Sequence, residues 1–241
     1  IAKVGETLYF CGRWEAELNV NWLVWTHNPT DGWEKIAWES GGKGEGPMSP
    51  PSGLKLHGGK LWVYGSIANY AGIGSYDLET KTWAPLTGKN EQGADVFGNS
   101  DPNKGKPVND VAWNSKTGDM YLVGSTGGLV NPKFSSPKWI SQVIRVSKDG
   151  VYHPMGQMLK GQTPKAPNIQ DCIYIDETQE PADLYVAGVF NFYGDSPTHN
   201  SRMAYNVVKW DHKAQDWRPL EVGKGDQIYL SPLNKKEYPN G

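Results

Sequence analysis

The chain has 241 residues, enough for one substantial core, and its 11 Trp, 12 Tyr and 29 Gly suit short strands with tight turns better than helices. Its 24 basic and 26 acidic residues give a net charge of -2, and no basic run is interleaved with aromatic residues, which argues against a nucleic-acid partner. No stretch approaches the roughly 20 apolar residues of a membrane span, so membrane insertion is not expected.

In chain order, the predicted strands fall into four copies of one unit. Each copy holds a strand that ends in glycine, and these strands, which recur about every sixty residues, are 8–12, 61–65, 120–124 and 184–188. Each is followed by an apolar strand, at 22–26, 73–78, 142–147 and 206–211. A short polar turn then leads into a strand that begins with an aromatic residue: Trp33, Trp83, Tyr152 or Trp217.

Proline and a fourth strand define the expected strand order within each unit. The aromatic-led strands of the last three copies contain Pro85, Pro154 and Pro219. Because proline removes a donor from the ladder, we expect these strands to be outermost. A further strand precedes the glycine strand, at 109–113 and 170–174, with a degenerate copy at 52–56. The unit is therefore predicted to be a four-stranded antiparallel meander, which must stack against its neighbours to bury both faces.

The last copy carries the fullest set of repeat residues, with Lys209-Trp210-Asp211 followed by Trp217-Arg218-Pro219-Leu220. In these residues and in its glycine strands, the chain resembles kelch-like repeats and the central domain of galactose oxidase, particularly secreted repeats of this kind. The resemblance implies an all-β fold, a β-propeller of four-stranded antiparallel blades at about 1–40, 52–88, 108–156 and 169–223. It covers nearly the whole chain, but it is specific for architecture only, since such folds serve many functions.

A C-terminal strand predicted at 226–231 leaves two arrangements open for a single propeller domain that spans 1–241. The strand could return to complete the first blade, where residues 1–4 supply only the tail of an inner strand, and so close a four-bladed ring. Alternatively, it could begin a further blade, in which case the four blades of this chain are part of a larger propeller.

One face of such a propeller is expected to carry the recognition surface. Connections between second and third strands and between blades emerge on one face, and several are long, such as 13–21, 125–139 and 189–205. Long irregular loops on a rigid frame are typical of binding surfaces. Aromatic rings in or near these loops could stack on sugars or anchor a protein: Trp14, Tyr70, Trp139, Phe192 and Tyr193. The alternative is that these rings pack beneath their own loops.

Three carboxylates are predicted to occupy one equivalent position at the start of the innermost strand: Asp110, Asp171 and Asp226. A propeller directs side chains at this position toward the mouth of its central channel. A partial ring of carboxylates could bind a hard cation through oxygen ligands or accept hydrogen bonds from substrate hydroxyls. Alternatively, each carboxylate could accept hydrogen bonds from the backbone of a neighbouring blade.

These features favour a non-catalytic recognition or scaffold module, extracellular or at the cell surface, that binds a glycan or a protein through the long-loop face and needs no cofactor. One alternative is a carbohydrate-active enzyme, a glycoside hydrolase or lyase, with Asp110 and Asp171 as its catalytic carboxylate pair. Another is a structural assembly subunit with blade rims as interfaces. Copper radical chemistry of the galactose-oxidase kind is not expected, since the five histidines are scattered along the chain.

Overall fold

The structure of the chain, a computed structural model, describes residues 1–17, 20–39, 51–67, 72–90, 108–124, 143–156, 159–160, 169–190, 192–193, 202–203, 206–222 and 226–227. Strands and turns make up these residues, as the all-β prediction requires. Within these ranges, no helix is long and apolar enough to cross a membrane.

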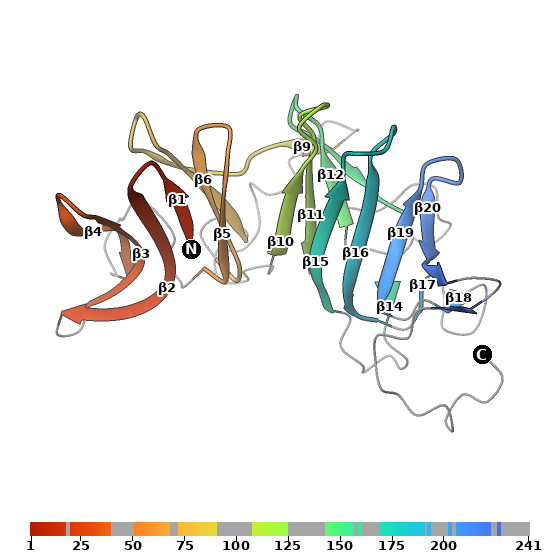
Figure 1. The fold of residues 1–241 in the computed structure, drawn as a ribbon, viewed down its shortest axis with the longest axis horizontal. Coiled ribbons are helices and arrows are strands. Elements are labelled where there is room, and N and C mark those ends of the chain that lie inside the picture. The colour runs from red at the N-terminus through yellow and green to blue at the C-terminus, as the bar shows by residue number, and fades with distance from the viewer. Residues whose placement is uncertain are drawn as a thin grey trace, which may run out of the picture.

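Four antiparallel sheets follow one another along the described chain, and in each of them four strands pair in sequence order (Figure 1). The first contains β1 (Ala2–Val4), β2 (Thr7–Glu17), β3 (Val20–Asn28) and β4 (Gly32–Glu39), and the second β5 (Gly53–His57), β6 (Lys60–Tyr64), β7 (Ile73–Asp77) and β8 (Trp83–Pro85). The third contains β10 (Val108–Trp113), β11 (Met120–Gly124), β12 (Val143–Val146) and β13 (Val151–Pro154), and the fourth β15 (Ile169–Asp176), β16 (Asp183–Val189), β19 (Val207–Asp211) and β20 (Asp216–Pro219). Four such meanders are the sheets expected of four propeller blades, so the predicted fold class is confirmed.

The third sheet departs from the predicted order because it has a strand beyond β13. A short strand, β9 (Lys89–Asn90), pairs parallel with β13 and makes this sheet five-stranded. The prediction that the proline-containing strands are outermost was therefore wrong for β13. Proline is tolerated here because β9 pairs with Val151 and Tyr152, and Pro154 lies beyond that pairing.

The connections predicted as long loops contain more regular structure than expected. Strands β2 and β3 extend through most of 13–21, so this segment is the end of a long hairpin. Farther along the chain, β14 (Leu159–Lys160), β17 (Phe192–Tyr193) and β18 (Arg202–Met203) form a small three-stranded sheet. The expectation of irregular loops was wrong for these segments, because paired strands satisfy backbone groups that a loop would leave to water.

The C-terminal part of the described chain forms a small hairpin. Strand β22 (Asp226–Gln227) pairs antiparallel with β21 (Glu221–Val222). The first sheet takes its innermost strand from β1, which pairs with β2, so among the described residues this sheet has four strands without a C-terminal one. Figure 1 shows the first and fourth sheets at opposite ends of the molecule.

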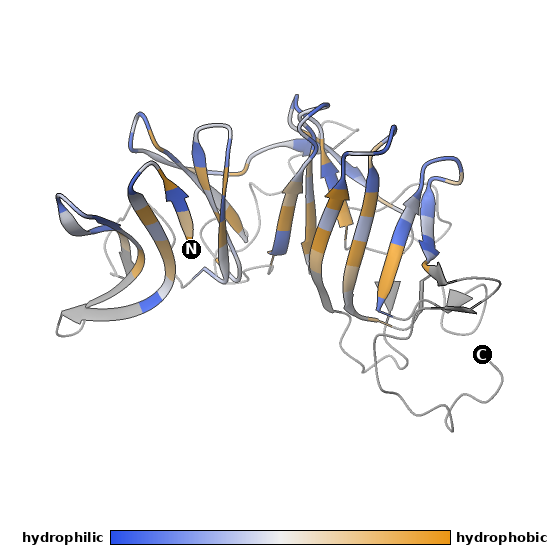
Figure 2. Ribbon diagram, viewed as in Figure 1, coloured by the Kyte–Doolittle hydropathy of each residue, from blue (hydrophilic) through white to orange (hydrophobic). Residues whose placement is uncertain are grey.

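Buried apolar side chains form three clusters at the junctions between successive sheets. Figure 2 shows hydrophobic residues along the strands of these sheets. Strand residues alternate between the two faces of a sheet, so each inner sheet contributes to two junctions. In the third sheet, Leu122 faces the second sheet, whereas Val123, the next residue, packs against the fourth. The chain therefore buries its apolar surface between sheets, as the repeat predicted.

Candidate functional site

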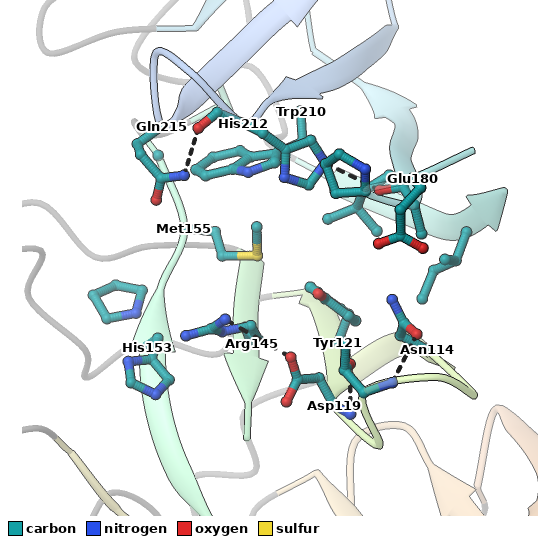
Figure 3. Close-up of a pocket in the computed structure, with 17 residues that line it drawn as sticks. Asn114, Asp119, Tyr121, Arg145, His153, Met155, Glu180, Trp210, His212 and Gln215 are labelled. Atoms are coloured by element: carbon teal, nitrogen blue, oxygen red, sulfur yellow. Dashed lines mark hydrogen bonds and ion pairs between the residues drawn. The ribbon is translucent and has the colours of Figure 1, made fainter. Parts of the chain in front are cut away.

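A cavity of about 330 Å³ lies between the third and fourth sheets, at the edge of the molecule that carries the short turns (Figure 3). Its volume falls in the range of small-molecule sites, about 300–1,000 Å³. The lining includes aromatic, charged, amide and thioether side chains: Asn114, Asp119, Tyr121, Arg145, His153, Met155, Glu180, Trp210, His212 and Gln215. This cavity is the candidate site.

The third sheet supplies one wall of the cavity through residues that pair directly across its strands. Tyr121 of β11 pairs with Arg145 of β12, which pairs with His153 of β13, so the register places all three on the same face. Asp119 lies just before β11, and its Oδ2 is 3.7 Å from a terminal nitrogen of Arg145. Because this distance exceeds that of a hydrogen bond, the guanidinium and the carboxylate keep donors and acceptors for a ligand.

The turn between β10 and β11 positions Asp119. The Asn114 side-chain oxygen accepts hydrogen bonds from the backbone N–H groups of Lys116 at 2.9 Å and Thr117 at 3.1 Å. The Asn114 N–H donates to the carbonyl of Asp119 at 2.9 Å, which closes the turn. Asparagine suits this place because its short side chain can bond to the backbone two residues on. The Asn114 side chain thus serves the fold as well as the cavity wall.

The fourth sheet supplies the opposite wall, in which Trp210 is the largest ring (Figure 3). Trp210 packs edge-on against Trp217, with ring centroids 5.0 Å apart and planes at 68°. The indole N–H of Trp217 donates to the carbonyl of Met155 at 3.2 Å, which ties the fourth sheet to the third. Gly156 has a φ of 57°, and a Cβ there would lie 2.6 Å from the Trp217 ring, so only glycine fits.

Turns of the fourth sheet complete the site. One ring nitrogen of His212 lies 3.0 Å from the carbonyl of Ala182, and the side-chain amide of Gln215 donates to the carbonyl of His212 at 2.8 Å. Beside the cavity, Ser115 and Lys116 of the third sheet bind Glu177 and Glu180 of the fourth. The Ser115 hydroxyl donates to Glu177 at 2.6 Å, and Lys116 lies 3.1 Å from Glu180. These polar contacts link the two walls at the surface.

The cavity lining carries both acidic and basic side chains, so neither sign of charge dominates. Burial raises the pKa of Tyr121, the Asp119 carboxylate raises it further, and Arg145 opposes both. Tyr121 therefore stays a neutral hydroxyl that can donate or accept. Donors, acceptors and aromatic rings in one cavity suit a neutral ligand rich in hydroxyl groups, because each hydroxyl both donates and accepts.

Asp110 has a structural place at the meeting point of three sheets. Its carboxylate accepts hydrogen bonds from Lys55 Nζ of the second sheet at 2.6 Å and from the N–H of Val111 at 2.8 Å. Its other oxygen accepts from the N–H of Ile173 in the fourth sheet at 3.1 Å. Burial, followed by the charge of Asp110, raises the pKa of Tyr64. A hydrogen bond to the backbone of a neighbouring blade was one of the predicted roles for this carboxylate, and Asp110 makes such a bond with Ile173.

The other two carboxylates do not share the position of Asp110. Asp110 pairs with Val123, next to Gly124, whereas Cys172 pairs with Ala187, next to Gly188. The glycine strands thus align Asp110 with Cys172, and Asp171 falls in the register shift between Gln170 and Cys172. Asp226 pairs with Val222 in the small C-terminal hairpin. The predicted equivalence was wrong by one residue: Asp171 corresponds to Asn109, the residue left unpaired in the other strand. The hairpins that join the innermost strands to the glycine strands differ in length, so likeness of sequence did not fix the register.

Three of the aromatic residues predicted to bind a ligand lie in strands. Trp14 lies in β2 and pairs with Trp22, which pairs with Trp38 in β4. Phe192 and Tyr193 form β17 of the small sheet. Tyr70 and Trp139 lie outside the described residues. The ligand-binding role of these five residues stays a prediction.

The cavity residues were not predicted, although the sequence contains a signal for them. Tyr121 in β11 and Arg145 in β12 interrupt the apolar pattern on a face that is buried against a neighbouring sheet and would be expected to hold apolar side chains, and Asp119 directly precedes β11. A polar group at such positions in successive strands indicates a polar lining between two blades. Among the described residues, no group of three or more His, Cys, Asp or Glu is arranged to hold a metal ion.

No family model and no curated protein matches the chain. Among solved structures, it is similar to the extracellular domain of a protein assigned as a one-component system of B. thetaiotaomicron, with a TM-score of 0.41 and 12% sequence identity. The match covers 92% of this chain and 29% of that one, so this chain spans less than a third of its length. At this identity and TM-score, the similarity says nothing about ligand or activity.

Proposed function

We propose that the chain is a non-catalytic recognition module that binds a glycan in the cavity between the third and fourth sheets. The observation that carries the proposal is the meeting, in about 330 Å³, of the Trp210 ring with the hydrogen-bonding groups of Asp119, Tyr121 and Arg145. Sugars present apolar C–H faces that stack on aromatic rings and hydroxyls that need both donors and acceptors. A kelch-like propeller at the cell surface is an architecture compatible with this role.

The long-loop face is a second surface on which this module could bind a glycan or a protein, as the sequence predicted. Trp14, Phe192 and Tyr193 lie in strands on segments first expected to be loops. Paired strands hold side chains more rigidly than loops do, which favours binding through rings. Binding to an immobilised glycan library by Trp14→Ala and Trp139→Ala variants tests this part, and wild-type binding in both variants would remove it.

The position of Asp110 is the reason for preferring recognition over catalysis. Its carboxylate is already engaged by Lys55, Val111 and Ile173, so it lacks the exposure that a nucleophile or a general acid needs. Asp110 is also only 8% exposed. An enzyme that used Asp110 with Asp171 would have to break this network before it could bind substrate.

The cavity is tested by glycan-library screening, followed by calorimetry with the best oligosaccharide. Arg145→Met should weaken binding about tenfold or more, because a charge-assisted hydrogen bond contributes about 1.5–3 kcal/mol. The matched control is Arg218→Met, which removes an exposed arginine that pairs with Asp211 outside the cavity. Equal affinity in both variants, or no glycan bound by the wild type, would refute the proposal.

A structural assembly subunit is the second candidate, and aromatic residues on the two end sheets favour it. Trp33 of the first sheet is 52% exposed and Tyr174 of the fourth is 64% exposed. Large exposed rings on sheet faces are typical of surfaces that bind other protein chains. Sedimentation of the chain at increasing concentration should then show association that Trp33→Ser reduces, and a monomer at all concentrations would contradict this function.

A further inference from the structure

The repeat positions whose side chains line the cavity between the third and fourth sheets have counterparts between the first and second sheets. There, Tyr9 pairs with Thr26 and Thr26 with Glu34, just as Tyr121 pairs with Arg145 and Arg145 with His153 in the third sheet. On the opposite wall, the pair Tyr76 and Trp83 corresponds to the pair Trp210 and Trp217. A groove of about 280 Å³ lies at this place, and we call it the N-terminal groove.

Between the second and third sheets, a large side chain occupies the corresponding place. Trp113 of β10 stacks on His57, with ring centroids 4.6 Å apart and planes at 9°, and lies 5.7 Å from the ring of Trp62. Trp62 corresponds to Tyr9 and Tyr121 in the repeat. Leu56 and Ile175 are the equivalents of Trp113 at the other two junctions. Each of the three residues pairs with the first apolar residue of the glycine strand in its own sheet. A smaller side chain at this position thus accompanies an open groove.

The N-terminal groove differs in chemistry from the first cavity. Glu34 stands where His153 does, and Thr26 stands where Arg145 does, so the strand residues that supply cationic or neutral donors in the cavity are replaced by a carboxylate and a hydroxyl. Asp31, Lys35 and Lys81 also line the groove, so its two carboxylates and two ammonium groups balance in charge. Glu34 is the carboxylate whose charge acts on the phenols of Tyr9 and Tyr76.

Three aromatic residues line the groove together with this carboxylate: Tyr9, Tyr76 and Trp83. The rings of Tyr76 and Trp83 have centroids 5.0 Å apart and planes tilted by 47°, so they form a corner. Burial raises the pKa values of Tyr9 and Tyr76, and the charge of Glu34 raises both further. Glu34 and both phenols line the same groove. Rings that meet at an angle, together with one carboxylate, form the kind of aromatic cage that recognises ammonium groups.

We propose that the N-terminal groove binds an organic ammonium ion, held by Tyr9, Tyr76 and Trp83 through cation–π contacts and by Glu34 through charge. The site is separate from the cavity of the proposed function and uses a different pair of sheets. The ammonium group could be borne by a small alkylammonium or by an amino sugar, since both present the same charge to the rings.

The test is calorimetric titration with choline and with its neutral isostere, in which a carbon atom replaces the nitrogen. Choline should bind more tightly, at least about fivefold, because the isostere keeps the shape and loses the cation–π attraction. Glu34→Gln should weaken choline binding by at least about fivefold while leaving the isostere unchanged. Leu56→Trp places at the groove the ring that fills the next junction and should abolish binding of both.

Control variants distinguish failure of this proposal from failure of the proposed function. Ile175→Trp fills the cavity between the third and fourth sheets, so it should abolish glycan binding and leave choline binding intact. Leu56→Trp adds bulk to a packed junction, so its folding is checked by thermal melting. If Leu56→Trp does not fold, the exposed substitution Glu34→Gln remains as the test.

A second titration compares glucosamine with N-acetylglucosamine, and preference for glucosamine identifies an amino sugar as a source of the ammonium. Equal affinity of Glu34→Gln and wild type for choline, or equal affinity for choline and its isostere, would overturn the proposal.

Discussion

Two junctions between sheets are built from the same repeat: that between the second and third sheets and that between the third and fourth. They differ at the edge with the short turns, where one is filled and the other contains a cavity. In the former, the ring of Trp113 fills the space beside Trp62 and His57. In the latter, Ile175 occupies the same position and a cavity of about 330 Å³ remains. The comparison shows that one side chain in the innermost strand distinguishes a closed junction from an open one, on a frame that is otherwise alike.

Replacing the filling side chain should have the largest effect. Trp113→Ala should lower the free energy of unfolding by about 3 kcal/mol, because it removes a large ring packed against two others and leaves a cavity. Urea denaturation followed by circular dichroism measures this loss. Trp33→Ala, at an exposed ring of the first sheet, is the control and should cost less than half as much. If both variants lose the same stability, Trp113 does not have the special role that the comparison gives it.

A smaller effect is expected at Asp110, which joins the closed junction to the open one. Asp110→Asn should destabilise the chain by about 2 kcal/mol, since the charge that Lys55 Nζ and the Ile173 N–H both face is lost. Asp183→Asn is the matched control, because Asp183 binds Lys209 at the same 2.6 Å distance within a single sheet. We expect the control to lose clearly less stability in the same denaturation assay. A greater loss in the control would show that bonding between sheets adds nothing.

The smallest effect concerns Glu177, which binds the turn of the third sheet beside the open junction. Hydrogen bonds from the side chain and then the backbone of Ser115 lower the pKa of Glu177 below its ordinary value of 4.5. Since the folded pKa is depressed, its stabilisation is fully present above that ordinary value and is lost as the pH falls through the lower folded pKa. The melting temperature of Glu177→Gln should therefore lie below that of the wild type at about pH 7, and the gap should close by about pH 2. Glu79→Gln, which makes the same substitution at an exposed turn of the second sheet, is the control variant.

The repeat itself could be predicted from the sequence because it is written in local patterns. Glycine at the end of a strand, alternation of apolar residues and aromatic residues after polar turns each depend on neighbours a few positions away. These signals located the glycine strands and the four-sheet order that the structure shows. They did not locate β9, because its two residues pair with a strand about sixty residues later in the chain.

Register inside the innermost strands could not be predicted. Each innermost strand contains a bulge, at Asn109 and at Asp171, and the hairpins that these strands begin differ in length, so likeness of sequence aligned Asp110 with Asp171 where the pairing aligns it with Cys172. Bulges leave little trace in composition, because the extra residue is simply left out of the pairing. The structural role of Asp110 likewise depends on Lys55 and Ile173, which approach it only when three sheets stack.

The amino-acid sequence by itself determined that four like sheets form and bury one another, because strand formation follows from the alternation and turn chemistry of each segment. Which junctions stay open was decided only by tertiary structure. Trp113, Ile175 and Leu56 hold equivalent places, but the space each one fills is set by side chains from two different sheets. Packing between sheets depends on the combined volumes of side chains from distant parts of the chain, and these cannot be inferred from the local sequence pattern.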